Sequence, residues 1–106
     1  MDVRTAVSRL EAQWEQPAGF LGALRQGLFQ PGGVEALLAV LREVDVGASE
    51  GGRTIDRRLV ALSWFIPTFM GWQRERVRER GGDVGQLDVA INKVVGVLLE
   101  RVLGAP

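Results

Sequence analysis

Apolar residues recur along most of this chain at spacings of three and four, which is the pattern of amphipathic helices. Such stripes predict helices at about residues 3–15, 17–28, 33–45 and 84–103. The stripe of the last helix is the longest and consists of Val84, Leu87, Ile91, Val94, Leu98 and Val102. No run alternates apolar and polar residues, so we expect no strand.

The pattern changes at residues 59–72, LVALSWFIPTFMGW, which carry no charge over fourteen positions. This stretch is apolar on every side of a helical projection, so other parts of the chain or a partner must cover it. We predict a helix over about 54–80 that kinks at Pro67, because proline removes a backbone hydrogen bond and collides with the carbonyl four residues earlier. The two segments are then about 54–66 and 67–80.

The long kinked helix presents two faces. The face predicted to enter the core consists of Ile55, Leu59, Leu62, Ile66 and Phe69. The other face consists of Val60, Trp64, Thr68 and Trp72, spaced four apart. Its large rings stand beside polar residues, so it is the face that the domain itself is least expected to bury.

Caps and breaks separate the predicted helices. Asp2 and Thr54 are suitable N-caps, and Asp83 followed by Gln86 resembles a capping box. In the 17–28 helix, which Pro17 is expected to open, Gly22 and its small neighbours permit close approach to another helix. The GASEGGR stretch at 47–53 has the composition of a loop, and we expect the weakest order of the chain there.

Length and composition favour one globular domain over residues 1–106. The chain is 46% hydrophobic and 25% charged, which is typical of folded proteins and not of disordered ones. The predicted fold is an all-α compact bundle of four to five helices. We expect no membrane span, because fourteen residues at about 1.5 Å each fall short of the ~30 Å hydrocarbon core.

The chain has no cysteine, histidine or tyrosine. It therefore lacks the commonest general base and the commonest transition-metal ligands, and no loop has the acidic spacing of a calcium site. We expect no catalytic, cofactor or metal site, and a protein that is not an enzyme.

Charge is balanced overall but not locally. Thirteen basic and thirteen acidic residues cancel, yet residues 53–80 hold seven basic and three acidic side chains. Within that segment Arg74, Arg76, Arg78 and Arg80 fan out around a helix end. They are either solvated cations at the negative end of a helix dipole or part of a protein-binding surface; the net charge of zero disfavours nucleic acid.

These observations predict a non-catalytic, bacterial-style protein-binding module. Its most concrete form is a small cytoplasmic inhibitor of the immunity or antitoxin kind, which occludes a toxin or effector with an acidic surface. The cytoplasmic location is expected because the charged amino terminus lacks the apolar run of a secretory signal. The partner-binding residues are predicted to be Trp64, Trp72, Arg74, Arg76 and Arg78.

Two other functions remain open. One is a homo-oligomeric structural protein that buries the face of Trp64 and Trp72 across a two-fold axis. The other is a sensor of an apolar small molecule, with a pocket that opens at the Pro67 kink.

Overall fold

The structure, a computed structural model, describes residues 1–44 and 55–104, and this part of the chain is built of helices alone. Of these residues 72% are helical and none lies in a strand, which confirms the all-α class. The segments are α1 (Val3–Trp14), α2 (Phe20–Leu24), α3 (Pro31–Arg42), α4 (Arg57–Ser63), α5 (Ile66–Trp72), α6 (Arg74–Glu79), α7 (Val84–Val97) and a π-helical turn, η2 (Leu98–Val102). They are shorter and more numerous than the four to five helices predicted.

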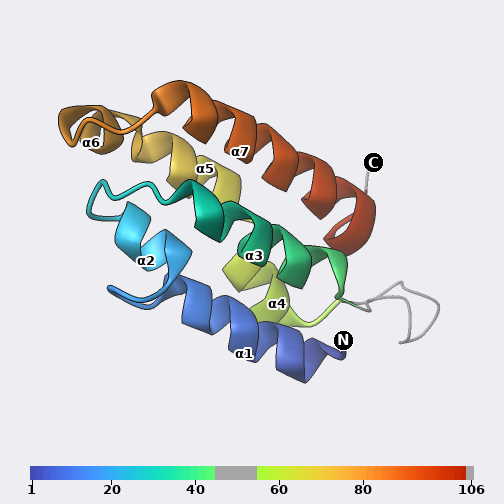
Figure 1. Ribbon diagram of the computed structural model, residues 1–106. Coiled ribbons are helices and arrows are strands. Elements are labelled where there is room, and N and C mark those ends of the chain that lie inside the picture. The colour runs from blue at the N-terminus through green and yellow to red at the C-terminus, as the bar shows by residue number, and fades with distance from the viewer. Residues whose placement is uncertain (45–54, 105–106) are drawn as a thin grey trace.

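Three long helices set the frame of the bundle. In Figure 1, α3 lies between α1 and α7 and contacts both, while α4 packs against α1 and α5 against α7. The start of α1 and the red C-terminal turn lie toward one end of the bundle, and α2 and α6 lie at the opposite end (Figure 1). The radius of gyration is 13.8 Å, close to the value of about 13 Å for a compact domain of this size.

One hydrophobic core joins all these elements. Its largest fully buried side chains are Leu10, Leu21, Leu24, Leu37, Leu38, Leu41, Leu59, Ile66, Met70 and Leu87. The predicted core face of the kinked helix is buried at Leu59, Leu62, Ile66 and Phe69. Ile55 is the exception, with 39% of its surface exposed, because it precedes the first turn of α4.

Aspartates cap three of the helices. The Asp2 carboxylate accepts from the Thr5 backbone N–H at 2.8 Å, and this bond lowers the pKa of Asp2. Asp83 accepts from the Gln86 N–H at 3.0 Å, as the predicted capping box requires. The prediction for α4 was wrong: Asp56, not Thr54, is the N-cap, and it accepts from the Leu59 N–H at 2.9 Å.

The 17–28 segment holds much less helix than predicted. α2 begins at Phe20 rather than Pro17, and Gly27 ends the segment with a φ of +83°, a conformation that favours glycine. The expected close approach does occur, because a Cβ at Gly22 would collide with the Glu15 carbonyl. Gly22 thus lets α2 lie against the end of α1, whereas Gly27 ends the segment beside Arg76 of α6.

The break in the long helix lies one turn earlier than predicted. Residues 64–65 form the turn between α4 and α5, and Pro67 lies in the first turn of α5. Backbone N–H groups in the first turn of a helix have no helical partner, so the N–H that proline lacks costs no hydrogen bond there. Proline acts on the preceding turn because its ring collides with the carbonyl of Ser63. The Ser63 hydroxyl donates to the Leu59 carbonyl at 2.7 Å, as expected for a serine that helps to bend a helix.

A second, unpredicted break separates α5 from α6 at Gln73. Gln73 is 4% exposed, and its side-chain amide donates to the Phe69 carbonyl at 3.3 Å. In a continuous helix that carbonyl would accept from the Gln73 backbone N–H, which turns instead to Met70. A buried glutamine has therefore displaced one backbone bond.

The other helix boundaries differ from the predicted ones by a few residues. α3 begins at Pro31, an ordinary first helical position for proline, and ends at Arg42 rather than residue 45. α7 ends at Val97, and the chain widens into the π-helical η2 before residue 103. The predicted loop at 47–53 lies outside the described residues. None of the described helices has the length and apolar character to cross a membrane.

Candidate protein-binding surface

Three aromatic residues form an exposed surface on α5 and on the turn between α4 and α5. This surface, called the aromatic face below, consists of Trp64, Phe65 and Trp72. Trp64 is 55% exposed and Trp72 67% exposed. The half-buried Phe65 lies between them, with its ring centroid 5.5 Å from Trp64 and 5.1 Å from Trp72. Both tryptophans lie outside the core, on the face whose burial by the domain was least expected from the sequence.

Beneath the aromatic face lies a pair of rings, the buried Phe69 and the half-buried Trp14. Phe69 meets Trp14 of α1 edge-on at a centroid distance of 4.8 Å, and Phe65 lies 6.4 Å from Phe69. The Trp14 indole N–H donates to the Leu62 carbonyl at 2.9 Å, which ties α1 to α4. The aromatic face therefore stands on rings that are held in place.

Arg25, just after α2, covers this ring pair. Its guanidinium carbon lies 5.3 Å from the Phe69 centroid and 6.0 Å from the Trp14 centroid, within cation–π range. The sequence does not indicate that Arg25 covers these rings, because Arg25 lies far along the chain from residues 64–76. Only the packing of α2 against α1 brings it here.

Arg76 approaches the same place from α6. Its guanidinium donates to the Gln73 side-chain oxygen at 2.8 Å and to the Arg25 carbonyl at 3.3 Å. Among residues 1–44 and 55–104, no carboxylate lies within 4.0 Å of the Arg25 or Arg76 guanidinium. The structure thus brings together two cations whose charge no described acidic side chain neutralises at contact distance.

A groove joins these residues. It has a volume of about 410 Å³ and is lined by Arg25, Phe65, Phe69, Trp72, Gln73 and Arg76. We call it the Arg25–Trp72 groove. It offers aromatic surface and two guanidinium groups in one hollow, at one side of the aromatic face.

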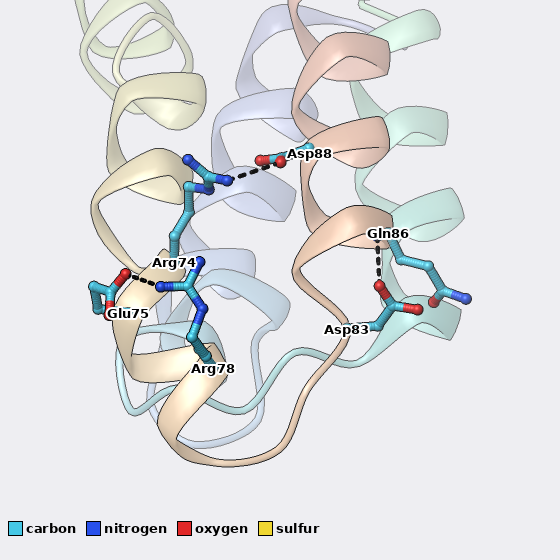
Figure 2. A network of polar contacts seen from close by, with 6 residues as sticks. All are labelled: Arg74, Glu75, Arg78, Asp83, Gln86 and Asp88. Atoms are coloured by element: carbon cyan, nitrogen blue, oxygen red, sulfur yellow. Dashed lines mark hydrogen bonds and ion pairs between the residues drawn. The ribbon is translucent and has the colours of Figure 1, made fainter.

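The other two predicted arginines point elsewhere, as Figure 2 shows. Arg74 reaches α7, where its guanidinium lies 3.0 Å from the Asp88 carboxylate, and Arg78 pairs with Glu75 on its own helix. Both pairs are exposed, so each contributes only about 0–1 kcal/mol. Trp64, Trp72 and Arg76 therefore share one region, whereas Arg74 and Arg78 are engaged with acids of the protein itself.

A second hollow lies between α3 and α7, not at the Pro67 turn. It has a volume of about 210 Å³, and its apolar lining includes Phe29, Val34, Val89 and Ala90. Glu35 and Lys93 also line it. Nothing in the described contacts links this hollow to the aromatic face.

No group of three or more acidic side chains among the described residues is placed to hold a metal ion. Comparison with protein-family models, curated proteins and solved structures found no match to this chain. The case for function therefore depends on the aromatic face and its flanking arginines.

Proposed function

We propose that this protein is a non-catalytic protein-binding module whose partner covers the aromatic face. The observation that carries the proposal is the exposure of Trp64 and Trp72, 55% and 67%, on either side of Phe65. Tryptophan and arginine are the residues most often found as anchors of protein interfaces. Exposed apolar area of this kind gains about 25 cal/mol per Å² when a partner removes it from water.

The most concrete form of the proposal is a small cytoplasmic inhibitor of the immunity or antitoxin kind. Such a protein needs a stable scaffold and one occluding surface, and it needs no catalytic group. The proposed partner is a toxin or effector with an acidic surface, because the cations beside the aromatic face favour negative charge. Of the five residues predicted from the sequence, Trp64, Trp72 and Arg76 carry the proposal; Arg74 and Arg78 are secondary.

The homo-oligomeric alternative would use the same aromatic face, with a second copy as the occupant. The ligand-sensor alternative would place an apolar molecule near the Pro67 turn. Both are separated from the proposal by the experiment that follows.

The test compares Trp64→Ala/Trp72→Ala with the control Val89→Ala/Leu99→Ala. The control changes two exposed apolar residues on another face, 54% and 42% exposed. Tagged proteins are used to capture partners from a native lysate, with mass spectrometry to identify them and light scattering to measure the mass of the isolated protein. We expect wild type and control to capture the same partner, and the tryptophan variant to lose it with an unchanged circular dichroism spectrum.

Three results would contradict the proposal. A stable dimer of the isolated protein that the tryptophan variant dissociates would favour self-association. Retention of an apolar compound in native mass spectrometry would favour a ligand sensor. Partner capture that survives in the tryptophan variant and fails in the control would move the binding surface to α7 and η2.

A further inference from the structure

We propose that the Arg25–Trp72 groove binds an acidic, apolar segment of the partner protein, with a carboxylate held between Arg25 and Arg76 and an apolar side chain against Trp72. This inference rests on the proposed function and names the chemistry of the partner at the same site. It also assigns a binding role to Arg25.

The charge of Arg25 and Arg76 favours a carboxylate in the groove. Four ion pairs occur in the described part of the chain, and neither Arg25 nor Arg76 belongs to one. By contrast, the neighbouring Arg74 and Arg78 each have an acid at contact distance. A carboxylate from outside therefore has two guanidinium groups to meet in the groove, and guanidinium binds carboxylate through two parallel hydrogen bonds.

The protein holds the Arg25 and Arg76 side chains in position. Arg76 is tied at its Nη1 atom to Gln73 and to the Arg25 carbonyl, and Arg25 lies over the Phe69 ring at 5.3 Å. Gln73, in turn, is buried and bonded to Phe69. Because both cations are held by the protein, less side-chain freedom is lost when they bind a carboxylate.

The apolar part of the groove favours an apolar side chain next to the carboxylate. Phe65, Phe69 and Trp72 line it beside the two arginines. Aromatic surface excludes water around a charged pair and strengthens its attraction. A segment that presents an aliphatic or aromatic side chain next to Asp or Glu contacts both the aromatic rings and the two guanidinium groups of the groove. A small anion contacts only the guanidinium groups.

A nucleic-acid strand fits the charges less well. Its affinity comes from a row of phosphates, each of which must meet a cation. Arg80, one turn beyond Arg76, also belongs to no ion pair among the described residues, but it does not line the groove. The next arginines on this helix, Arg74 and Arg78, already contact Asp88 and Glu75, so only a short group of cations is open to phosphates. Two cations in an aromatic groove suit one or two carboxylates better.

The test selects binders from a displayed library of random peptides and measures their affinity for matched variants. Arg25→Gln/Arg76→Gln removes the two charges, and Arg74→Gln/Arg78→Gln is the control with the same change on paired arginines. We expect the selected peptides to contain Asp or Glu next to an apolar residue. Their affinity should fall on the order of tenfold or more with the first variant and change little with the control.

Two further measurements make the test specific. Replacing the acidic residue of a selected peptide by its amide should weaken binding to wild type but not to Arg25→Gln/Arg76→Gln. Arg25→Lys/Arg76→Lys keeps the charge, so it should restore part of the affinity. Circular dichroism and thermal unfolding of each variant show whether the fold is intact.

The outcomes separate this inference from the proposed function. Peptides that need Trp72 but are neutral or basic, or that bind Arg25→Gln/Arg76→Gln unchanged, would overturn the acidic groove and leave the aromatic face in place. Peptides that bind a Trp72→Ala variant as well as wild type would overturn both. Displacement of the peptides by single-stranded DNA at lower concentration than by acidic peptide would also overturn the inference.

Discussion

At the scale of single residues, neighbours decide what each tryptophan does. Trp14 packs edge-on against Phe69 and donates to the Leu62 carbonyl, so it joins α1 to α4. The Trp64 and Trp72 indoles donate no hydrogen bond to any residue that the structure describes, and more than half of the surface of each side chain is exposed. Two of the three tryptophans are therefore surface residues, and that is unusual enough to ask what covers them.

The arginines divide in the same way. Arg74 and Arg78 belong to ion pairs, whereas Arg25 and Arg76 line a groove beside aromatic rings. Sequence spacing groups Arg74, Arg76 and Arg78 because they alternate along one helix. The structure regroups Arg76 with Arg25, because the turn after α2 meets the break at Gln73.

Two core substitutions test the described burial. Leu62 is 7% exposed, so Leu62→Ala should lower the free energy of unfolding by about 2 to 5 kcal/mol. Ile91 is only partly buried, so Ile91→Ala should cost less, about 1 to 2 kcal/mol. Urea denaturation of both variants measures the difference. Equal losses would mean that Ile91 is as deeply buried as its place in the sequence stripe predicts.

At the scale of elements, the segment from α4 to α6 shows how local bonds divide a helix. Pro67 and Ser63 act at the first break, and the buried Gln73 amide acts at the second. Along the divided segment Leu59, Ile66 and Phe69 lie in the core, and Trp64 and Trp72 lie outside it.

The start of α4 gives the element-scale prediction. Asp56→Ala removes the bond from the Leu59 N–H, and loss of an N-cap costs about 0.5–2 kcal/mol of stability. Asp56→Asn is the matched control, because asparagine caps a helix about as well. Thermal or urea unfolding compares the two. If both variants lose the same stability, the charge of Asp56 matters more than its hydrogen bond.

At the scale of the whole molecule, the formal net charge is zero, but the charges are unevenly distributed over the surface. Acids and arginines pair on the α6–α7 side. Arg25, just after α2, and Arg76, on α6, contact no carboxylate of the described residues and lie at the end of the bundle that holds α2 and α6 (Figure 1). A molecule arranged in this way has no strong overall field, so its charges act at short range on a docked partner.

The whole-molecule prediction concerns helix content and mass. Far-ultraviolet circular dichroism should give well over half of the residues as helix and essentially no strand, as the described residues do. Light scattering should give the mass of one chain, 11.6 kDa, for the isolated protein, since the proposed occupant of the aromatic face is a different protein. A substantial sheet signal would contradict the fold, and twice the mass would contradict the proposed occupant.

Much of the fold follows from the sequence alone. The three-and-four spacing of apolar residues predicts every long helix and most of its buried face, because a helix must turn one stripe toward the core. The caps at Asp2 and Asp83 follow from bonds between near neighbours. The sequence also singled out the face of Trp64 and Trp72 as the one least expected to be buried, and the structure shows both exposed.

Tertiary structure decided the rest. The burial of the Gln73 side chain, which accompanies the second break, depends on packing against the rest of the core. The meeting of Arg25 with Phe69, Trp72 and Arg76 depends on how α2 packs against α1. Contacts between residues far apart in the chain leave no periodic trace in the sequence. Local spacing therefore determined which residues face outward, and only long-range packing determined which of them form a site.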